Sequence, residues 1–235
     1  MEIGRAAAWL FAACSLLPAR TSALLLEDLN IDLNPEKQVR FVPLSNNGPR
    51  RSIYTLSMVQ VSVPKAQGTE SEINDGSLMW SPQKLLLSPG ERAGFKLYYS
   101  GPKDDRERYY RVTFTETPLA AVPLPSGNAQ TRSDFRIAIS AIVIVRPARL
   151  RFSYRITDSE IINTGNSYFK YMAAQGCSKK YQQAIYLAPG ESWSFQPAER
   201  GAKKIVVFEN QIIPVSHCDE TGKNRSMPGG IGLKQ

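Results

Sequence analysis

The sequence has 235 residues, of which 42% are hydrophobic and 21% are charged, and its net charge is +8. The basic residues are interspersed rather than gathered into a Lys/Arg-rich block, and the aromatic residues alternate as in strands. This pattern argues against a nucleic-acid-binding protein. The length allows one large domain or two small ones.

The first 23 residues are predicted to be a cleavable signal peptide. Arg5 precedes an apolar run from Ala6 to Leu17, and the small residues Thr21, Ser22 and Ala23 fit a signal-peptidase site. The apolar run of about 12 residues is shorter than the ~20 that a membrane-spanning helix needs. Cleavage after Ala23 leaves 212 residues, of which 27 are basic and 20 are acidic, and it removes Cys14. We therefore expect an exported protein with no membrane insertion after signal cleavage.

Short strand patterns follow one another along the mature chain. They are expected at 39–44, 53–63, 84–87, 95–99, 109–115 and 135–145, and after Pro147 at 150–156, 160–163, 168–174, 184–187, 193–196, 203–208 and 211–215. Turn signals such as Asn46-Asn47-Gly48 and Pro189-Gly190 separate many of them, and no segment has convincing helical periodicity. The sequence predicts an all-β fold of two tandem immunoglobulin-like β-sandwich domains, 24–147 and 148–218, with a flexible tail at 219–235.

The strand expected at 135–145 changes character along its length. Phe135, Ile137 and Ile139 alternate with small or polar residues, whereas residues 141–145 are apolar throughout, as in a strand buried on both faces. We expect this strand to leave the core and continue as an exposed apolar edge. Proteins normally blunt such an edge, so one that keeps it is expected to use it for binding. The alternative is a plain inner strand whose Phe and Ile side chains fill the protein's own sandwich.

Several segments, taken in order, resemble a known family. Residues 81–90 read SPQKLLLSPG. Residues 95–118 read FKLYYSGPKDDRERYYRVTFTETP and are predicted to form an antiparallel hairpin of strands 95–99 and 109–115, whose connection we expect to be too charged for burial. The segments VIVRP at 143–147 and NTGN at 163–166 complete the series. This series, which extends over most of the mature chain, resembles the periplasmic pilus chaperones of the chaperone–usher pathway. The resemblance is strongest to the alternate branch of common-pilus type, particularly its second chaperone.

The resemblance implies that the strand at 135–145 lends hydrophobic side chains to an incomplete pilin sandwich. The donor residues would be Phe135, Ile137, Ile139, Ala141 and Val143. It further implies a periplasmic chaperone, with pilin subunits and an outer-membrane usher as partners. A secreted two-domain adhesion or structural module remains the alternative.

The better-known members of the family hold the pilin's terminal carboxylate with an Arg and a Lys in the cleft between the domains. The resemblance places Asn30 and Ile142 at the two corresponding positions here, so it implies that the usual anchor is missing. Candidate replacements for this cleft contact are Arg40, Arg111, Arg136 and Arg146. The alternative for each is an ordinary solvated charge. The charged residues 104–108 are expected to pair structurally, and the resemblance suggests that they position the domains.

The sequence predicts neither an enzyme nor a cofactor. It contains one histidine, His217, and it has no nucleophile elbow, Walker loop or nucleotide fingerprint. Cys177, His217 and Cys218 do not have the spacing of common structural zinc sites, so no metal is expected. One disulfide between Cys177 and Cys218 is the simplest pairing in an oxidising compartment, and two free or intermolecular thiols are the alternative.

Overall fold

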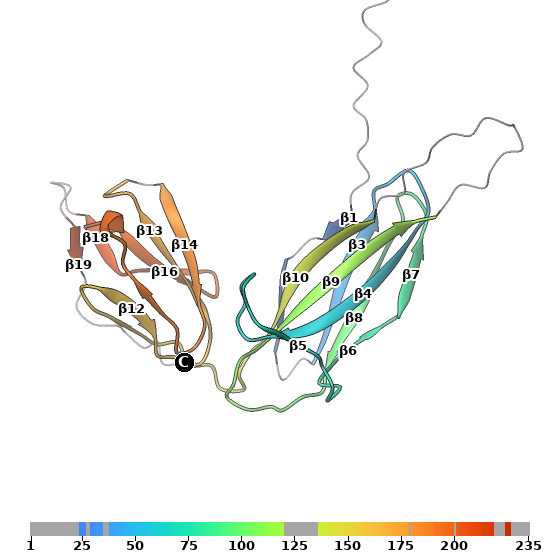
Figure 1. Cartoon of the computed structure of the whole chain (residues 1–235), viewed down its shortest axis with the longest axis horizontal. Helices are drawn as coiled ribbons and strands as arrows, with labels where there is room; N and C mark the ends of the chain where they lie inside the picture. Colours follow the sequence, from blue (N-terminus) through green and yellow to red (C-terminus); the bar gives the residue numbers. More distant parts are fainter. Residues whose placement is uncertain are drawn as a thin grey trace, which may run out of the picture.

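The computed structural model describes residues 24–26, 29–34, 38–119, 136–178, 180–199, 201–218 and 224–226, with the backbone alone for 217, 218 and 224–226. The predicted signal peptide and Phe135 lie outside these residues. The described chain forms strands β1 to β19 and one short 3-10 turn, arranged as two β-sandwiches (Figure 1). The predicted all-β fold is confirmed. Within these ranges no helix is long and apolar enough to cross a bilayer.

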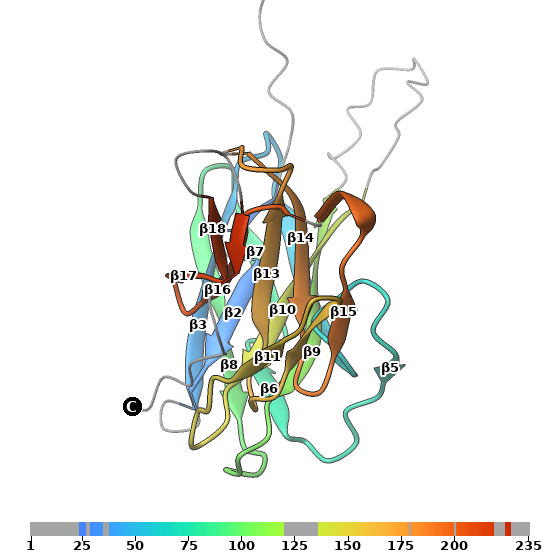
Figure 2. The same cartoon turned by 90° about the vertical axis from the view of Figure 1, so that its left-hand side faces the viewer.

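The first sandwich packs two sheets against each other. One sheet has the order β1 (Leu24–Leu26), β3 (Val39–Asn46), β8 (Arg92–Tyr99), β6 (Leu78–Ser81). The other has the order β2 (Asn30–Leu33), β10 (Ile137–Val145), β9 (Arg108–Pro118), β4 (Ser52–Val61), β5 (Glu70–Ser71), and β7 (Lys84–Leu87) also pairs with β4. In Figure 2, β3 and β8 of one sheet lie to the left of β9 of the other.

Alternating side chains of both sheets fill the core of this sandwich. Tyr54, Phe95, Leu97 and Phe114 are completely buried, and the rings of Phe95 and Phe114 lie 6.0 Å apart. Over most of β4, β8 and β9, a buried residue is followed by a more exposed one, which is the period of a sheet with one face on a core. The sequence pattern therefore fixes which side chains of β8 and β9 point inward.

The second sandwich is smaller. Its sheets have the orders β11 (Tyr154–Ile156), β12 (Glu160–Asn163), β15 (Ser192–Ser194), and β14 (Tyr181–Leu187), β13 (Phe169–Ala174), β16 (Lys204–Phe208), β17 (Gln211–Pro214). A 3-10 turn at Pro197–Glu199 and a two-stranded sheet of β18 (Ser216–Cys218) and β19 (Asn224–Ser226) complete it. Its core is aromatic: the Phe152 ring stacks on Phe208 at 4.5 Å and meets Phe169 edge-on at 5.8 Å.

The two sandwiches repeat the same buried corner. In the first, the Asn46 side chain donates to the carbonyl of Leu87 at 3.0 Å and accepts from the amide of Gly48 at 2.9 Å. In the second, Asn163 donates to Leu187 at 2.9 Å and accepts from Gly165 at 2.9 Å. Because a buried amide side chain must have its hydrogen bonds made, each Asn ties a tight turn to the end of a distant strand.

Four predictions about local structure need correction. The strands at 95–99 and 109–115 were expected to pair as a hairpin, but β8 and β9 lie in different sheets, because the connection between them crosses from one layer of the sandwich to the other. The strand expected at 150–156 is confined to Tyr154–Ile156, because the carbonyls of Arg151 and Ser153 accept bonds from the 164–166 turn instead of from a strand. Strands β1, β2, β5, β6, β18 and β19 were not predicted, and β19 lies within the segment expected to be a flexible tail. The charged connection before β9 was expected to be exposed, yet the Glu107 side chain is 0% exposed.

Candidate functional site

Strand β10 is paired on both sides over only part of its length. It pairs antiparallel with β9 from Ile137 to Val145, but its parallel partner β2 extends only from Asn30 to Leu33, opposite Ile142 to Val145. The first half of β10, residues 137–141, therefore has one strand neighbour among the described residues. Its other edge presents backbone donors and acceptors, and an incoming extended segment can bond to these groups.

Burial divides the predicted donor residues into two groups. Ala141 and Val143 are 2% and 0% exposed and belong to the core of the first sandwich. Ile137 and Ile139 lie on the same face but are half-buried at the margin of that core. A partner cannot take Ala141 or Val143 without opening the sandwich, so the structure restricts the accessible part of the predicted donor face to Ile137 and Ile139. Phe135 lies outside the described residues.

Arg146 follows β10 directly and joins the two sandwiches. Its guanidinium contacts Asp32 of β2 at 3.0 Å, Glu107 at 3.0 Å and the Ser167 hydroxyl at 2.7 Å, and it lies 4.9 Å from the centroid of the Tyr168 ring. Burial by itself would lower the pKa of Arg146, but the carboxylates of Asp32 and Glu107 outweigh it and raise that pKa. Arg146 therefore remains a cation held between both domains.

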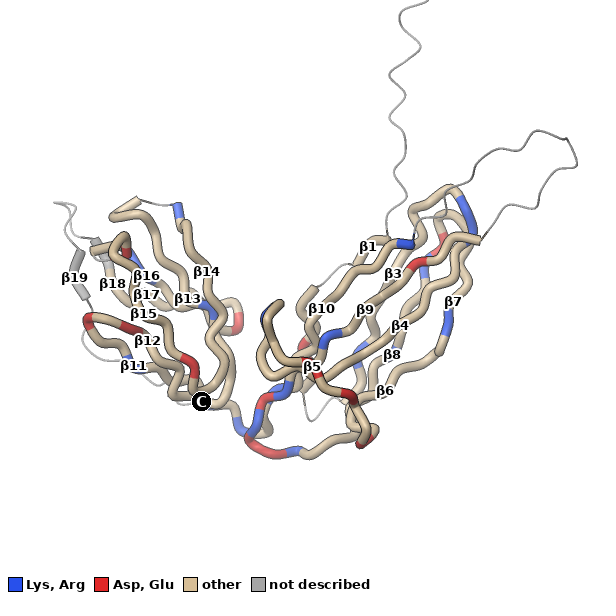
Figure 3. The backbone as a smooth tube through the Cα atoms, in the orientation of Figure 1, with Lys and Arg blue, Asp and Glu red and all other residues tan. Residues whose placement is uncertain are grey.

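Glu107 is the buried counterpart of Arg146. Its carboxylate accepts bonds from the Tyr168 amide at 2.8 Å, the Tyr109 hydroxyl at 2.5 Å and the Ser167 hydroxyl. Burial, together with the Glu107 charge, raises the pKa of Tyr109. Four donors satisfy one buried carboxylate, which is the condition for keeping a charge out of water. The concentration of charged residues at this junction is visible in Figure 3.

Further contacts fix the relative position of the two domains. Lys65, in the loop between β4 and β5, forms an ion pair of 2.7 Å with Glu191 of the second domain. Beneath this pair, Val61, Tyr109 and Ile144 of the first domain pack against Ala188 of the second. Because apolar packing and ion pairs act at the same boundary, the angle between the sandwiches is specified rather than left to a loose linker.

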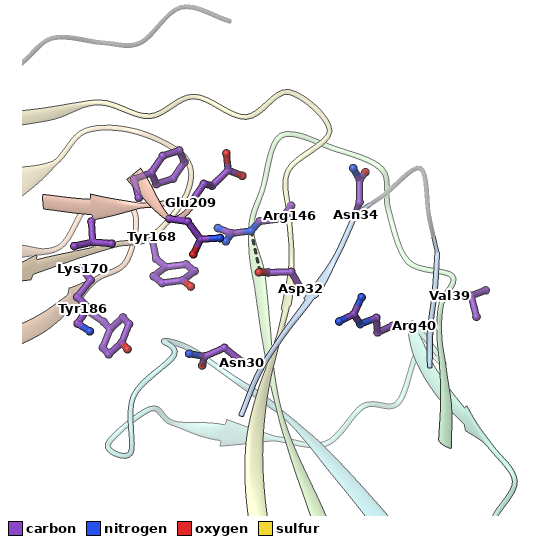
Figure 4. A pocket seen from close by; sticks show the side chains of 13 residues that line it. Asn30, Asp32, Asn34, Val39, Arg40, Arg146, Tyr168, Lys170, Tyr186 and Glu209 are labelled. Atoms are coloured by element: carbon purple, nitrogen blue, oxygen red, sulfur yellow. Dashed lines mark ion pairs between the residues drawn. The ribbon is translucent and has the colours of Figure 1, made fainter. Parts of the chain in front are cut away.

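A cleft of about 620 Å³ lies beside this junction and is lined by both domains (Figure 4). The first domain contributes β2, Arg40 and Arg146, and the second contributes β13, β14 and the β16–β17 turn. Its lining residues are Asn30, Asp32, Asn34, Val39, Arg40, Arg146, Tyr168, Lys170, Tyr186, Val207, Phe208, Glu209 and Asn210. Asn30, one of the lining residues, pairs with Ile142, the first residue of β10 that has a strand neighbour on both sides.

The four predicted arginines are not brought together. Arg40 and Arg146 line the cleft. Arg111 does not line it; this residue forms an ion pair with Glu70 and donates a hydrogen bond to the carbonyl of Lys65 at 2.9 Å. Arg136 is exposed next to the start of β10. Asn30 and Ile142, the two positions at which the usual anchor is missing, are opposite each other in the β2–β10 register.

Sequence reasoning missed Lys170. This residue lies on β13 and faces the cleft, with its Nζ 5.7 Å from the centroid of the Tyr186 ring. It forms no ion pair with any of the described residues, in contrast to Arg146. The alternation of Phe169, Lys170 and Tyr171 in the sequence could have placed Lys170 at an outward position of its strand, and the structure confirms that position. The sequence does not indicate that this outward face meets the other domain.

Cys177 is disulfide-bonded. The side chain of Cys218 lies outside the described residues, so the pairing of these two cysteines stays a prediction.

Comparison with known proteins now adds to this geometry. A family model described as the EcpB C-terminal domain matches residues 152–215. The probable fimbrial chaperone EcpE of Escherichia coli K12 is 30% identical over 215 residues, which cover 89% of this chain and 91% of EcpE. The chain belongs to the fimbrial chaperone family. Within that family, the probable fimbrial chaperone EcpB of Klebsiella pneumoniae strain 342 is 23% identical, over 82% of this chain and 91% of its own.

Solved structures of fimbrial chaperones share the fold. The Escherichia coli chaperone DraB superposes with a TM-score of 0.58 at 13% identity, covering 82% of this chain and 97% of DraB. The SafB chaperone of Salmonella enterica, in its complex with the SafA pilin, gives 0.57 at 14% identity, with coverages of 91% and 97%. The predicted pilus-chaperone architecture of two immunoglobulin-like domains is confirmed. The family favours a chaperone over the secreted adhesion module.

Proposed function

We propose that this fimbrial chaperone acts in the periplasm, binds pilin subunits by adding the open half of β10 to an incomplete pilin sheet, and passes the subunits to an outer-membrane usher. The observation that carries the proposal is the pairing of β10. Residues 142–145 have neighbours on both sides, whereas residues 137–141 have β9 alone among the described residues. Residues 142–145 therefore hold β10 in the sandwich, while the free edge of residues 137–141 can pair with a pilin strand.

The chemistry of the open half fits strand addition. Backbone hydrogen bonds along the edge supply affinity, and alternate side chains enter pockets of the partner. Ile137 and Ile139 are separated by the period of two that places both on one face, and both are half-buried. Each would add roughly 1.5 to 3 kcal/mol if fully buried in a pilin, less the part of its surface that is already covered.

We further propose that the cleft holds the terminal carboxylate of the bound pilin, and that Lys170 supplies the charge-assisted bond. Asn30 lies in the same cleft and offers an amide donor, while Tyr186 covers one side of Lys170. Arg146 is a poorer candidate, because the carboxylates of Asp32 and Glu107 already neutralise it. Lys170 has no carboxylate partner among the described residues, so it is a better binding site for an incoming carboxylate than Arg146 is.

The proposal is tested by co-expressing the tagged chain with a pilin and recovering the complex from periplasmic extract. Ile139→Asp is expected to abolish recovery of the pilin, because a carboxylate cannot enter an apolar pocket. The matched control is Ser140→Asp, since Ser140 is the next residue of β10 but is exposed on the opposite face. Circular dichroism of both variants verifies the fold. Undiminished pilin recovery with folded Ile139→Asp would rule out this use of β10.

A further inference from the structure

The outer face of the sheet β1–β3–β8–β6 carries several apolar side chains that are exposed to solvent. The inward side chains of these strands fill the core, so strand alternation directs Leu25, Val39, Phe41 and Met79 outward. Each of these four side chains is 48–52% exposed. Scattered apolar residues on a surface are ordinary, but four on one face of one sheet form a patch that calls for an explanation.

The register places Val39, Met79 and Phe41 in two adjacent rows, whereas Leu25 lies two rows beyond Phe41, in the row of Arg92. Val39 and Met79 lie on either side of Tyr98, and in the next row Phe41 lies opposite Lys96. Gly94 makes room for the Phe41 ring, because a Cβ at position 94 would come within 2.5 Å of it. The Phe41 ring therefore lies on the sheet surface in a place that the neighbouring strand leaves open for it.

The charges on this face have one sign. Among the outward positions of the four strands, Arg92 and Lys96 are the charged residues, and no carboxylate occurs. The other sheet of the same domain is the internal comparison: its outward positions include hydroxyls, such as Thr113 and Ser140, which bond to each other at 2.9 Å, and its Arg111 is paired with Glu70. The two outer faces of one sandwich thus differ in chemistry, because the strands of this sheet carry four exposed large apolar side chains, whereas the strands of the other sheet carry one, Leu86.

We propose that this face, defined by Leu25, Val39, Phe41, Met79, Arg92 and Lys96, docks peripherally on an anionic phospholipid bilayer. Apolar side chains flanked by cations match the chemistry of such a surface, in which acyl chains lie beneath negative headgroups. Face-to-face pairing with a second copy is disfavoured, because it would bring the same cations together without a carboxylate to offset them. Docking through this sheet leaves β10, which belongs to the other sheet, accessible to a partner.

Flotation with lipid vesicles tests the docking. The full mature chain is mixed with vesicles of phosphatidylcholine and phosphatidylglycerol at 3:1, and separately with phosphatidylcholine alone. We expect binding to the anionic vesicles only, and a decrease as salt is raised, because salt screens the charge attraction. Lys96→Glu is expected to weaken binding on the order of tenfold or more, because it replaces an attractive charge by a repulsive one.

Matched variants distinguish vesicle binding through this face from nonspecific hydrophobic binding and from an effect of net charge. Phe41→Ser is compared with Leu86→Ser, and Lys96→Glu with Lys84→Glu, because Leu86 and Lys84 are exposed on β7 of the other sheet. Thermal melts verify that each variant is folded. Selective loss of vesicle binding in Phe41→Ser and Lys96→Glu supports the proposal. Equal binding to both vesicle types, equal loss in the β7 controls, or a dimer that Phe41→Ser converts to monomer would overturn it.

Discussion

The Nη1 atom of Arg146 lies 3.0 Å from the Oε2 atom of Glu107, and this buried pair joins the end of β10 to the connection that leads into β9. The same two residues contact Ser167 of the second domain. The pair thus acts at three places: at the end of the strand proposed to bind pilin, at the start of its antiparallel neighbour β9, and at the contact with the second sandwich.

Removing one member of this pair should destabilise the protein strongly. Glu107→Ala leaves Arg146 buried against Tyr168 with Asp32 as its remaining carboxylate partner, so we expect a loss of about 3 to 5 kcal/mol in the free energy of unfolding. Urea unfolding measures the loss, and small-angle X-ray scattering reports the angle between the domains.

The control for this variant is Asp105→Ala. Asp105 pairs with Arg149 at 2.8 Å near the same junction, but this pair is exposed to solvent. We expect only a small shift of its urea midpoint, because water screens exposed ion pairs. Equal midpoint shifts in the two variants would contradict the special role of the buried pair.

The two halves of β10 should respond differently to truncation. Val143→Ala removes packed methyl groups from a completely buried position, so we expect it to cost about 2 kcal/mol of stability. Ile139→Ala changes a half-buried side chain at the core margin, so its effect on unfolding should be smaller and its effect on pilin binding larger. Measuring both variants by urea unfolding and by pilin pull-down tests this division. A binding defect confined to Val143→Ala would contradict it.

The sequence could predict the strands that bury alternate side chains, because their period of two is a local signal. It could not predict β2, whose four residues Asn30–Leu33 include two polar side chains and pair with a strand more than a hundred positions away. It misjudged Glu107 for a related reason: burial of a carboxylate depends on donors from a second domain. Lys170 escaped notice because nothing in its own strand indicates what its outward face meets.

Reduction should destabilise the second domain. If Cys177 is bonded to Cys218, the disulfide closes a loop of about 40 residues and adds roughly 3 to 4 kcal/mol in the chain-entropy model. We expect Cys218→Ser to lower the melting temperature by the same amount as reductant does, and reductant to have no further effect on this variant. Two titratable thiols per native, unreduced mature chain would contradict the pairing.

Acid should weaken the connection before β9. Arg108 donates to both carboxylate oxygens of Asp104, at 2.7 and 2.8 Å, and lowers the pKa of Asp104 from 3.8 to about 2. Because the folded-state pKa is depressed, the stabilisation is fully present above the unfolded pKa and is lost as pH falls from about 4 towards 2. The difference in urea midpoint between the wild type and Asp104→Asn should therefore shrink over this range. In an Arg108→Gln background the same difference should be small at every pH.

Lys170 should matter for pilin binding and little for the fold. Its side chain is half-buried in the cleft and forms no ion pair among the described residues, so Lys170→Gln removes a charge without leaving a buried carboxylate unpaired. If Lys170 receives the terminal carboxylate of a pilin, we expect pilin affinity to fall about tenfold or more, the value of one charge-assisted hydrogen bond. Surface plasmon resonance measures the change, with an immobilised peptide that carries the C-terminal strand of a pilin.

The control is Lys180→Gln, because Lys180 is exposed outside the cleft. Amidation of the peptide's carboxyl terminus should weaken binding to the wild type but not to Lys170→Gln, and equal weakening in both would assign the carboxylate to another residue.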